Sequence, residues 1–159
     1  MKVNIENVYR DFYASLTDDS TRNLLSIIHK ALADEYFIWN FKTGLRYYLK
    51  GKKEFLIFYQ NRDGSARLKI RLEHIEKYEQ EISKCSEIIK NCIYNEKQCN
   101  YCGDCSTQIH LTHDGKELSI CNPTWWWTCF YFKELRNLSK EDVKSLLNLI
   151  NHELPFYKK

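Results

Sequence analysis

The sequence predicts an α+β protein in which an antiparallel sheet has helices packed on one face and a C-terminal Cys-rich metal-binding hairpin follows. Three observations predict this class. Apolar residues recur with helical spacing towards both ends of the chain, a two-residue alternation occupies residues 37–72, and four cysteines cluster between residues 99 and 121. The 159 residues are 43% apolar and 14% aromatic and include only two prolines, which is typical of an ordered globular protein.

The first 36 residues are expected to form two helices. Apolar residues recur three and four positions apart between Ile5 and Phe12, and again between Leu24 and Leu32. The segment 17–20, Thr-Asp-Asp-Ser, separates the two runs. Its side-chain oxygens can cap the second helix, and its two carboxylates suit the positive end of that helix.

Residues 37–72 are expected to form a four-stranded antiparallel meander. Glycines at positions 44, 51 and 64 separate runs that are rich in branched and aromatic residues. The pair Asp63-Gly64 is a turn sequence, because both residue types accept a positive φ at low cost. The expected strands are 37–42, 45–50, 54–60 and 66–72, and their short links make neighbouring strands antiparallel.

The second half of the chain is expected to contain a helix, a hairpin, a strand and a last helix. Apolar residues three and four apart predict one helix over residues 73–94. His113-Asp114-Gly115 joins two alternating runs, 107–112 and 116–121, into a hairpin. After an aromatic strand, Ser139 is the expected N-cap of the last helix, which Pro155 ends. We expect residues 1–98 to form an α+β core and residues 99–159 to pack on that same core.

Four of the seven cysteines have the spacing of metal ligands, in the pattern Cys99-x2-Cys102-x2-Cys105-x15-Cys121. Polar residues and Gly103 surround them, which is the setting of a tight turn and not of a core. The hairpin that follows Cys105 returns the chain to Cys121, so four thiolates can converge on one ion. Four soft ligands suit tetrahedral zinc, which is the cofactor that we expect.

Two histidines and two further cysteines in the second half of the chain are expected to serve in packing. His110 and His113 are alternative zinc ligands, but a regular hairpin places His113 at its far tip, so we expect both histidines to lie on the surface or pack against the hairpin. Cys85 and Cys92 lie seven apart on the apolar stripe of the helix expected over 73–94. They are expected to be small buried apolar residues.

The first three of the four clustered cysteines also resemble the cluster-binding run of bacterial ferredoxins. In that family the last ligand directly precedes proline, whereas here Asn122 lies between Cys121 and Pro123. The resemblance covers only residues 99–123 and implies an iron–sulfur cluster and electron transfer. An iron–sulfur redox protein is therefore the first alternative to a structural zinc site.

A basic face is expected on the meander. Residues 37–72 contain nine Lys or Arg residues against two Asp or Glu residues, although the whole chain has a net charge of only +3. In the expected strand 45–50, alternation places two cations and one tyrosine on one side, and in the expected strand 66–72 it places three cations on one side. If the strands are in register, both sets lie on the same face of the sheet. The candidate anion-binding residues are Arg46, Tyr48, Lys50, Arg67, Lys69 and Arg71. This face either binds nucleic acid or another polyanion, or is the solvated side of a half-buried sheet.

The run Trp125-Trp126-Trp127 places at least one large ring on an exposed face, because adjacent residues of a strand point to opposite faces. Burial of Trp126 exposes Trp125 and Trp127, or the reverse. The exposed rings can shield the cysteine hairpin, stack on a ligand or contact another subunit. Trp125 and Trp127 are therefore the candidate ligand-stacking residues.

We expect a cytosolic, metal-stabilised, non-enzymatic binding or regulatory module. The start of the sequence lacks the apolar block of a signal peptide, and no apolar run approaches the roughly 20 residues that span a bilayer, so no membrane association is expected. The catalytic motifs of nucleotide-binding, dinucleotide-binding, metalloprotease and serine hydrolase families are absent from the sequence. An enzyme acting on a small anionic substrate, in a cleft walled by the tryptophans and basic residues, remains a further alternative.

Overall fold

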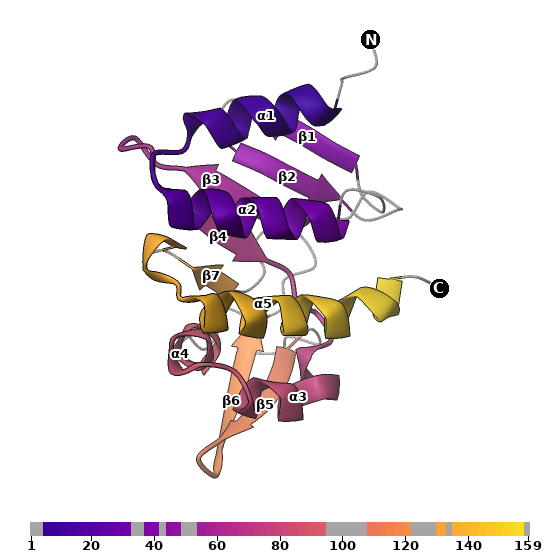
Figure 1. Ribbon diagram of the computed structural model, residues 1–159. Helices are drawn as coiled ribbons and strands as arrows, with labels where there is room; N and C mark the ends of the chain where they lie inside the picture. Colours follow the sequence, from indigo (N-terminus) through magenta and orange to yellow (C-terminus); the bar gives the residue numbers. More distant parts are fainter. Residues whose placement is uncertain are drawn as a thin grey trace. The chain divides into compact units, whose positions relative to one another are not determined.

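A computed structural model describes residues 5–32, 37–41, 44–48, 54–94, 108–121, 130–132 and 135–157 (Figure 1). These residues belong to two compact units. The first unit contains residues 1–70 and 131–138, and the second contains residues 71–130 and 139–159. The main division between the two units therefore falls at residue 70. The overall class is α+β, with helices and antiparallel sheets, as expected.

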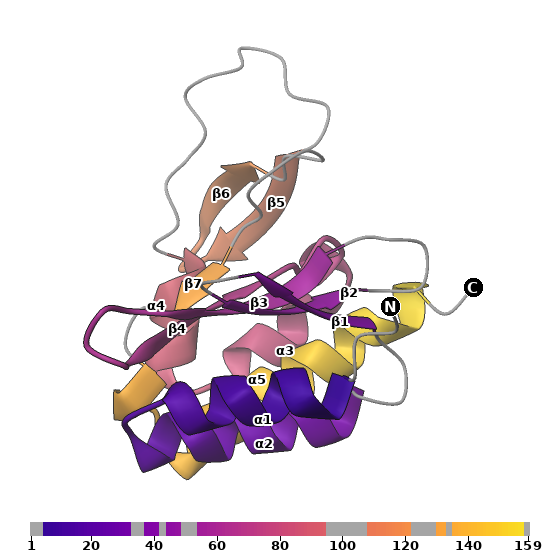
Figure 2. The same ribbon diagram turned by 90° about the horizontal axis from the view of Figure 1, so that it is seen from above.

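The two helices expected at the start of the chain are present as α1 (Ile5–Ser15) and α2 (Asp19–Leu32). Asp18 caps α2, since its Oδ1 atom accepts the N–H of Thr21 at 2.7 Å. Leu24, Leu25 and Ile28 on α2 are completely buried. Figures 1 and 2 show that α1 and α2 lie side by side on one face of the first sheet.

The predicted meander is confirmed. The first sheet has the order β1-β2-β3-β4-β7. Its strands are β1 (Phe37–Phe41), β2 (Gly44–Tyr48), β3 (Glu54–Gln60), β4 (Ala66–Ile70) and β7 (Phe130–Phe132). Consecutive strands from β1 to β4 pair antiparallel. β7 adds a short strand next to β4.

One face of this sheet supplies the core of the first unit. Leu45, Phe58 and Leu68 occupy one cross-strand row, and Tyr47, Leu56 and Ile70 occupy the neighbouring row. All six side chains are completely buried. Contacts with both helices identify this face as the one that α1 and α2 cover. The ring centroid of Phe12 on α1 lies 6.5 Å from that of Phe58, and His29 Nδ1 on α2 lies 3.1 Å from the Tyr47 hydroxyl.

The turn between β3 and β4 is fixed by its backbone. Gly64 has a φ of +80°, which favours glycine. The Asn61 N–H donates to the Ser65 carbonyl at 2.8 Å, and the Thr17 N–H donates to the Gly64 carbonyl at 3.1 Å. The turn is therefore fastened to the loop between α1 and α2.

The prediction of a single helix over residues 73–94 is wrong. The structure has a 3-10 helix η1 (Ile75–Tyr78), a helix α3 (Glu79–Ser83) and a helix α4 (Glu87–Tyr94). The N–H groups of Lys84 and Cys85 donate to carbonyls three residues earlier, which tightens the end of α3. The next N–H, that of Ser86, donates to Ser145 Oγ at 3.1 Å. This contact with a residue far along the chain replaces the helical bond, so the helix ends and α4 begins anew.

The remaining elements of the second unit are a hairpin and the C-terminal helices. The hairpin consists of β5 (Gln108–His113) and β6 (Lys116–Cys121), which pair antiparallel as predicted. A 3-10 helix η2 (Leu135–Asn137), part of the first unit, precedes α5 (Lys140–Glu153) and η3 (Leu154–Tyr157). Ser139 is the N-cap of α5, as predicted, and forms a capping box with Asp142. Among the helices described, none is long and apolar enough to cross a bilayer.

Candidate functional site

The expected cysteine site falls mostly outside the residues that the structure describes. Cys99, Cys102 and Cys105 belong to the range 95–107, which is not described, and Cys121 is described only as the last backbone position of β6. Within the described ranges, no group of three or more His, Cys, Asp or Glu side chains is arranged to hold a metal ion. The structure does establish the hairpin register, in which Gln108 pairs with Cys121.

Both hairpin histidines have packing partners, in line with their expected role. His113 pairs with Lys116 next to the turn, and its ring stacks on Tyr94 of α4, with centroids 3.9 Å apart. His110 lies opposite Ser119, and its Nδ1 atom is 3.2 Å from Ser119 Oγ. The apolar positions Ile109 and Leu111 of β5 are buried.

The two cysteines of the expected helix stripe differ in burial. Cys85 is 5% exposed, and its thiol donates to the Glu81 carbonyl at 3.4 Å. Burial raises the pKa of the Cys85 thiol. Cys92 on α4 is only half-buried. Cys85 is therefore the small buried apolar residue that the sequence predicted, and Cys92 is so only in part.

The expected basic face has the predicted alternation but not the predicted exposure. Arg46, Ile57 and Lys69 occupy one cross-strand row, so the two cations do share a face. However, Lys69 is only 5% exposed and Ile57 is buried, so this part of the face is not open to a polyanion. The expectation failed at Lys69 because alternation defines which residues share a face but not whether that face is covered.

The other candidate anion-binding residues have different surroundings. Arg67 is exposed, and its guanidinium lies 5.2 Å from the ring centroid of Tyr59. Arg71 lies in the second unit and is paired with Glu73, with Nη1 and Oε1 3.0 Å apart and both side chains nearly buried. Arg46 and Tyr48 are half-buried. Lys50 and the two candidate stacking residues, Trp125 and Trp127, lie outside the described residues.

The densest polar cluster in the described residues is one that the sequence did not predict. It surrounds Glu153, the last residue of α5, which is completely buried. One carboxylate oxygen accepts from the Tyr78 hydroxyl at 2.5 Å. The other lies 2.8 Å from His74 Nδ1 and accepts from the Tyr157 hydroxyl at 2.9 Å. The His74 backbone N–H also donates to this carboxylate, at 3.2 Å from the nearer oxygen.

Two further charged side chains, Glu73 and Arg71, extend this Glu153 cluster, and both are nearly buried. Tyr157 Oη also lies 2.9 Å from Glu73 Oε2, and Arg71 donates to the other oxygen of Glu73. Burial and the charge of Glu153 raise the pKa values of Tyr78 and Tyr157, so both phenols remain protonated donors. The chain of contacts therefore runs from the arginine through both carboxylates to His74.

Aromatic packing holds the outer side of the Glu153 cluster. The exposed Phe156 stacks on the imidazole of His74, with centroids 4.4 Å apart and planes 10° apart. Lys77 Nζ lies 5.1 Å from the centroid of the same phenyl ring. Sequence reasoning missed the cluster because residues 71–78 and 153–157 are far apart in the chain. The four-residue spacing of Glu153 and Tyr157 was the one local signal.

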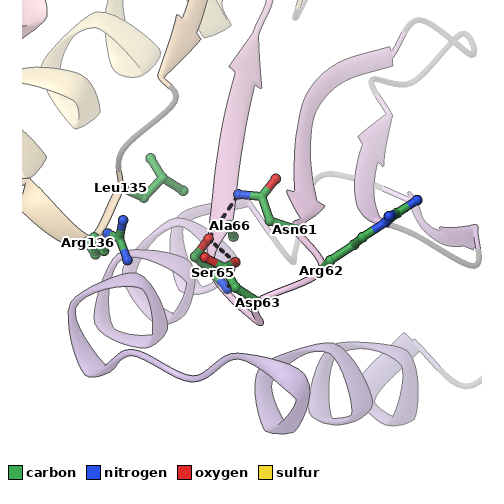
Figure 3. Close-up of a pocket in the computed structure, with 7 residues that line it drawn as sticks. All are labelled: Asn61, Arg62, Asp63, Ser65, Ala66, Leu135 and Arg136. Atoms are coloured by element: carbon green, nitrogen blue, oxygen red, sulfur yellow. Dashed lines mark hydrogen bonds between the residues drawn. The ribbon is translucent and has the colours of Figure 1, made fainter.

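A shallow depression of about 280 Å³ lies between the β3–β4 turn and η2 (Figure 3). Asp63 accepts hydrogen bonds from both the N–H and the hydroxyl of Ser65, which lower the pKa of its carboxyl. Figure 3 shows Arg136 beside the depression, whereas the Arg62 side chain points away from it. Opposite charges line this small space, so it favours no single class of charged ligand.

Comparison with known proteins identifies no relative: neither a family model, nor a curated protein, nor a solved structure matches this chain. The fold and these clusters define a two-unit α+β protein. Its function is therefore argued below from its own residues.

Proposed function

We propose that this protein is a small cytoplasmic binding or regulatory module, non-enzymatic, whose cysteine-rich segment is stabilised by a structural zinc ion. The proposed ligands are Cys99, Cys102, Cys105 and Cys121. The observation that supports the proposal is the register of the β5–β6 hairpin, in which position 121 lies directly opposite Gln108.

This register makes convergence of the cysteines geometrically feasible. Position 105 precedes Gln108 by three residues, so an extended chain places their Cα atoms at most about 10 Å apart. Position 121 is the cross-strand neighbour of Gln108, about 5 Å away. Other registers, with Cys121 displaced along β5 towards the turn, separate the last cysteine from the run of three. Four thiolates saturate zinc, so such a site stabilises the fold and leaves no open position for catalysis.

Metal analysis of protein purified without added metal tests this proposal. We expect stoichiometric zinc in the unmodified protein. Cys121→Ser should lose the zinc and melt at a lower temperature, whereas the control Cys92→Ser should retain its zinc. Cys92 is a suitable control because it lies on α4 and outside the proposed ligand set. Absence of metal from the unmodified protein contradicts the proposal. Iron with brown absorbance after anaerobic purification supports the iron–sulfur alternative instead.

A second candidate function is binding of nucleic acid or another polyanion at the first sheet. The observation that favours it is the exposed Arg67, whose guanidinium lies over the Tyr59 ring, because such a pair combines charge with a stacking surface. Binding to a fluorescent single-stranded oligonucleotide is expected to weaken steeply as salt increases. At a given salt concentration, Arg67→Gln is expected to bind the oligonucleotide more weakly than the unmodified protein. The control Lys140→Gln, on the exposed start of α5, should bind as the unmodified protein does. No binding at low salt eliminates this candidate.

An enzyme acting on a small anionic substrate is the third proposal. Its expected cleft involves Trp125 and Trp127, which lie outside the described residues. The Glu153 cluster is a set of titratable groups that can move protons, but its carboxylate is buried and fully engaged by donors of this chain. The binding module is therefore the function that we favour.

A further inference from the structure

The depression beside the β3–β4 turn has a carboxylate and a guanidinium on its rim. It is a space of about 280 Å³ within the first unit, and its polar rim includes Asn61, Asp63, Ser65 and Arg136. Common ligand pockets enclose roughly 300–1,000 Å³, so this smaller space suits a ligand of only a few heavy atoms. Within the described residues, no ion pair joins Asp63 to Arg136, so a ligand can lie between the two charges.

Asp63 presents a carboxylate whose position is fixed by the turn. Its Oδ1 atom accepts the Ser65 N–H at 3.0 Å and the Ser65 hydroxyl at 2.6 Å. Asn61 Nδ2 donates in turn to Ser65 Oγ at 3.0 Å (Figure 3). Both hydrogen bonds from Ser65 end on Oδ1, so Oδ2 keeps acceptor capacity for a ligand. Because the backbone of this turn is also bonded to Thr17, the carboxylate is held in place before any ligand arrives.

Arg136 supplies the opposite charge from η2. Its neighbour Leu135 is buried and anchors this short helix, and the Arg136 side chain lies beside the depression (Figure 3). Arg136 has a further interaction, but a guanidinium carries five N–H donors, so it can also bind a ligand carboxylate. The hydrogen bonds from Ser65 and, to a smaller extent, the charge of Arg136 lower the pKa of Asp63. The carboxylate on the rim is therefore ionised at neutral pH.

These two charges disfavour simple ions of either sign. An anion that is attracted by Arg136 is repelled by Asp63, and a cation that is attracted by Asp63 is repelled by Arg136. A ligand that carries both charges is attracted by both side chains. At pH 7 a free α-amino acid has an ammonium and a carboxylate that are separated by one carbon atom. Its ammonium can donate to Asp63 Oδ2 while its carboxylate accepts from the Arg136 guanidinium.

The floor of the depression favours a ligand with a small side chain. Its apolar lining residues are Ala66 and Leu135, and both are buried. They therefore offer little apolar area to a ligand, so a long apolar side chain gains little by binding there. The small volume of the depression limits the length of the side chain as well.

We propose that this depression binds a free α-amino acid with a short, neutral side chain, such as alanine. The ammonium group of the ligand contacts Asp63, and its carboxylate contacts Arg136. Both contacts lie at the surface, where each ion pair contributes little, so we expect an affinity in the millimolar range. The site includes no cysteine, so this inference is independent of the proposed zinc site.

Titration of the ¹⁵N-labelled protein with free alanine, at constant ionic strength and followed by NMR, tests this inference. We expect saturable shifts of the backbone resonances of Asp63, Ser65 and Arg136. Acetate and methylammonium each carry only one of the two charges of alanine, so both should bind more weakly than alanine does. Asp63→Asn keeps an acceptor for the Ser65 N–H but loses the charge. It should weaken alanine binding several-fold and strengthen acetate binding, whereas Arg136→Gln should weaken alanine binding and strengthen methylammonium binding.

Arg62→Gln is the matched control, because it removes a positive charge from the same turn although the Arg62 side chain points away from the depression (Figure 3). This variant should bind alanine as the unmodified protein does. Three results overturn the inference: no saturable shift with alanine, binding of acetate or methylammonium as tight as that of alanine, or equal weakening by all three charge variants. If a variant does not fold, the comparison of the three ligands on the unmodified protein decides the question. The zinc content does not enter this test, so its failure leaves the zinc proposal untouched.

Discussion

Replacement of Gly64 by alanine tests how the β3–β4 turn is fastened to the loop before α2. Gly64 has a φ of +80°, a left-handed conformation that costs an L residue about 1–2 kcal/mol. An added Cβ atom comes within 2.3 Å of Thr17 Cγ2 and 3.2 Å of Thr17 Cβ. The Cβ atom of Thr17 cannot simply move away, because the Thr17 N–H is bonded to the Gly64 carbonyl. Relief of the collision adds about 1–3 kcal/mol, so we expect a total loss of about 2–5 kcal/mol.

Gly115 provides the matched control. Its φ is +74°, and within the part of the chain described no atom lies within 4 Å of an added Cβ. Gly115→Ala therefore carries the backbone cost alone, about 1–2 kcal/mol. For a chain of this size, 1 kcal/mol corresponds to roughly 2–4 °C in melting temperature. Thermal unfolding followed by circular dichroism should thus show a clearly larger decrease for Gly64→Ala than for Gly115→Ala.

A double substitution isolates the steric part of the effect. Thr17→Ser removes Cγ2 and keeps the hydroxyl, so it should restore much of the stability that Gly64→Ala loses. Equal melting temperatures for the two glycine variants refute the reasoning. So does a double variant that is no more stable than Gly64→Ala, because the collision is then not the cause.

Three further predictions concern capping, pH and the core. Ser139→Ala should lower the free energy of unfolding by about 1 kcal/mol in urea titrations, because it removes the N-cap of α5, whereas an unchanged midpoint argues against the cap. Burial lowers the pKa of His29, despite the opposing charge of Glu6, so the folded state binds fewer protons than the unfolded state. Stability should therefore fall as the pH drops through about 6.5, and His29→Gln should flatten that fall in urea titrations at pH 7.5 and 5.5. Phe58→Ala should cost about 3–5 kcal/mol by the same titration, because Phe58 is completely buried against Phe12, and a loss below 1 kcal/mol contradicts this packing.

The elements that the sequence predicted correctly have local causes. Helical spacing defines α1 and α2, and strict alternation defines the meander, because each pattern is complete within one segment. The turns at Gly64 and Gly115 depend on two or three neighbouring residues. Such features need no knowledge of the rest of the fold.

The features that the sequence did not predict depend on residues far apart in the chain. The break between α3 and α4 follows from a hydrogen bond of Ser86 with Ser145, which no periodicity in residues 73–94 reveals. Lys69 has the alternation of an exposed strand residue, yet it is buried. The Glu153 cluster joins the ends of segments separated by most of the second unit. For the cysteine site, spacing alone suggested the ligands, and the register of the hairpin bears on only one of the four.

The position of β7 has a consequence for biosynthesis. β7 lies beside β4 in the sheet, although residues 71–129 separate the two strands along the chain. During translation, β4 therefore leaves the ribosome well before β7, the strand that pairs with its free edge. Until then, the nascent polypeptide displays a sheet edge to which another nascent copy can add. A truncated polypeptide that stops before residue 130 keeps that edge for good, which makes it prone to aggregate however well its earlier strands fold.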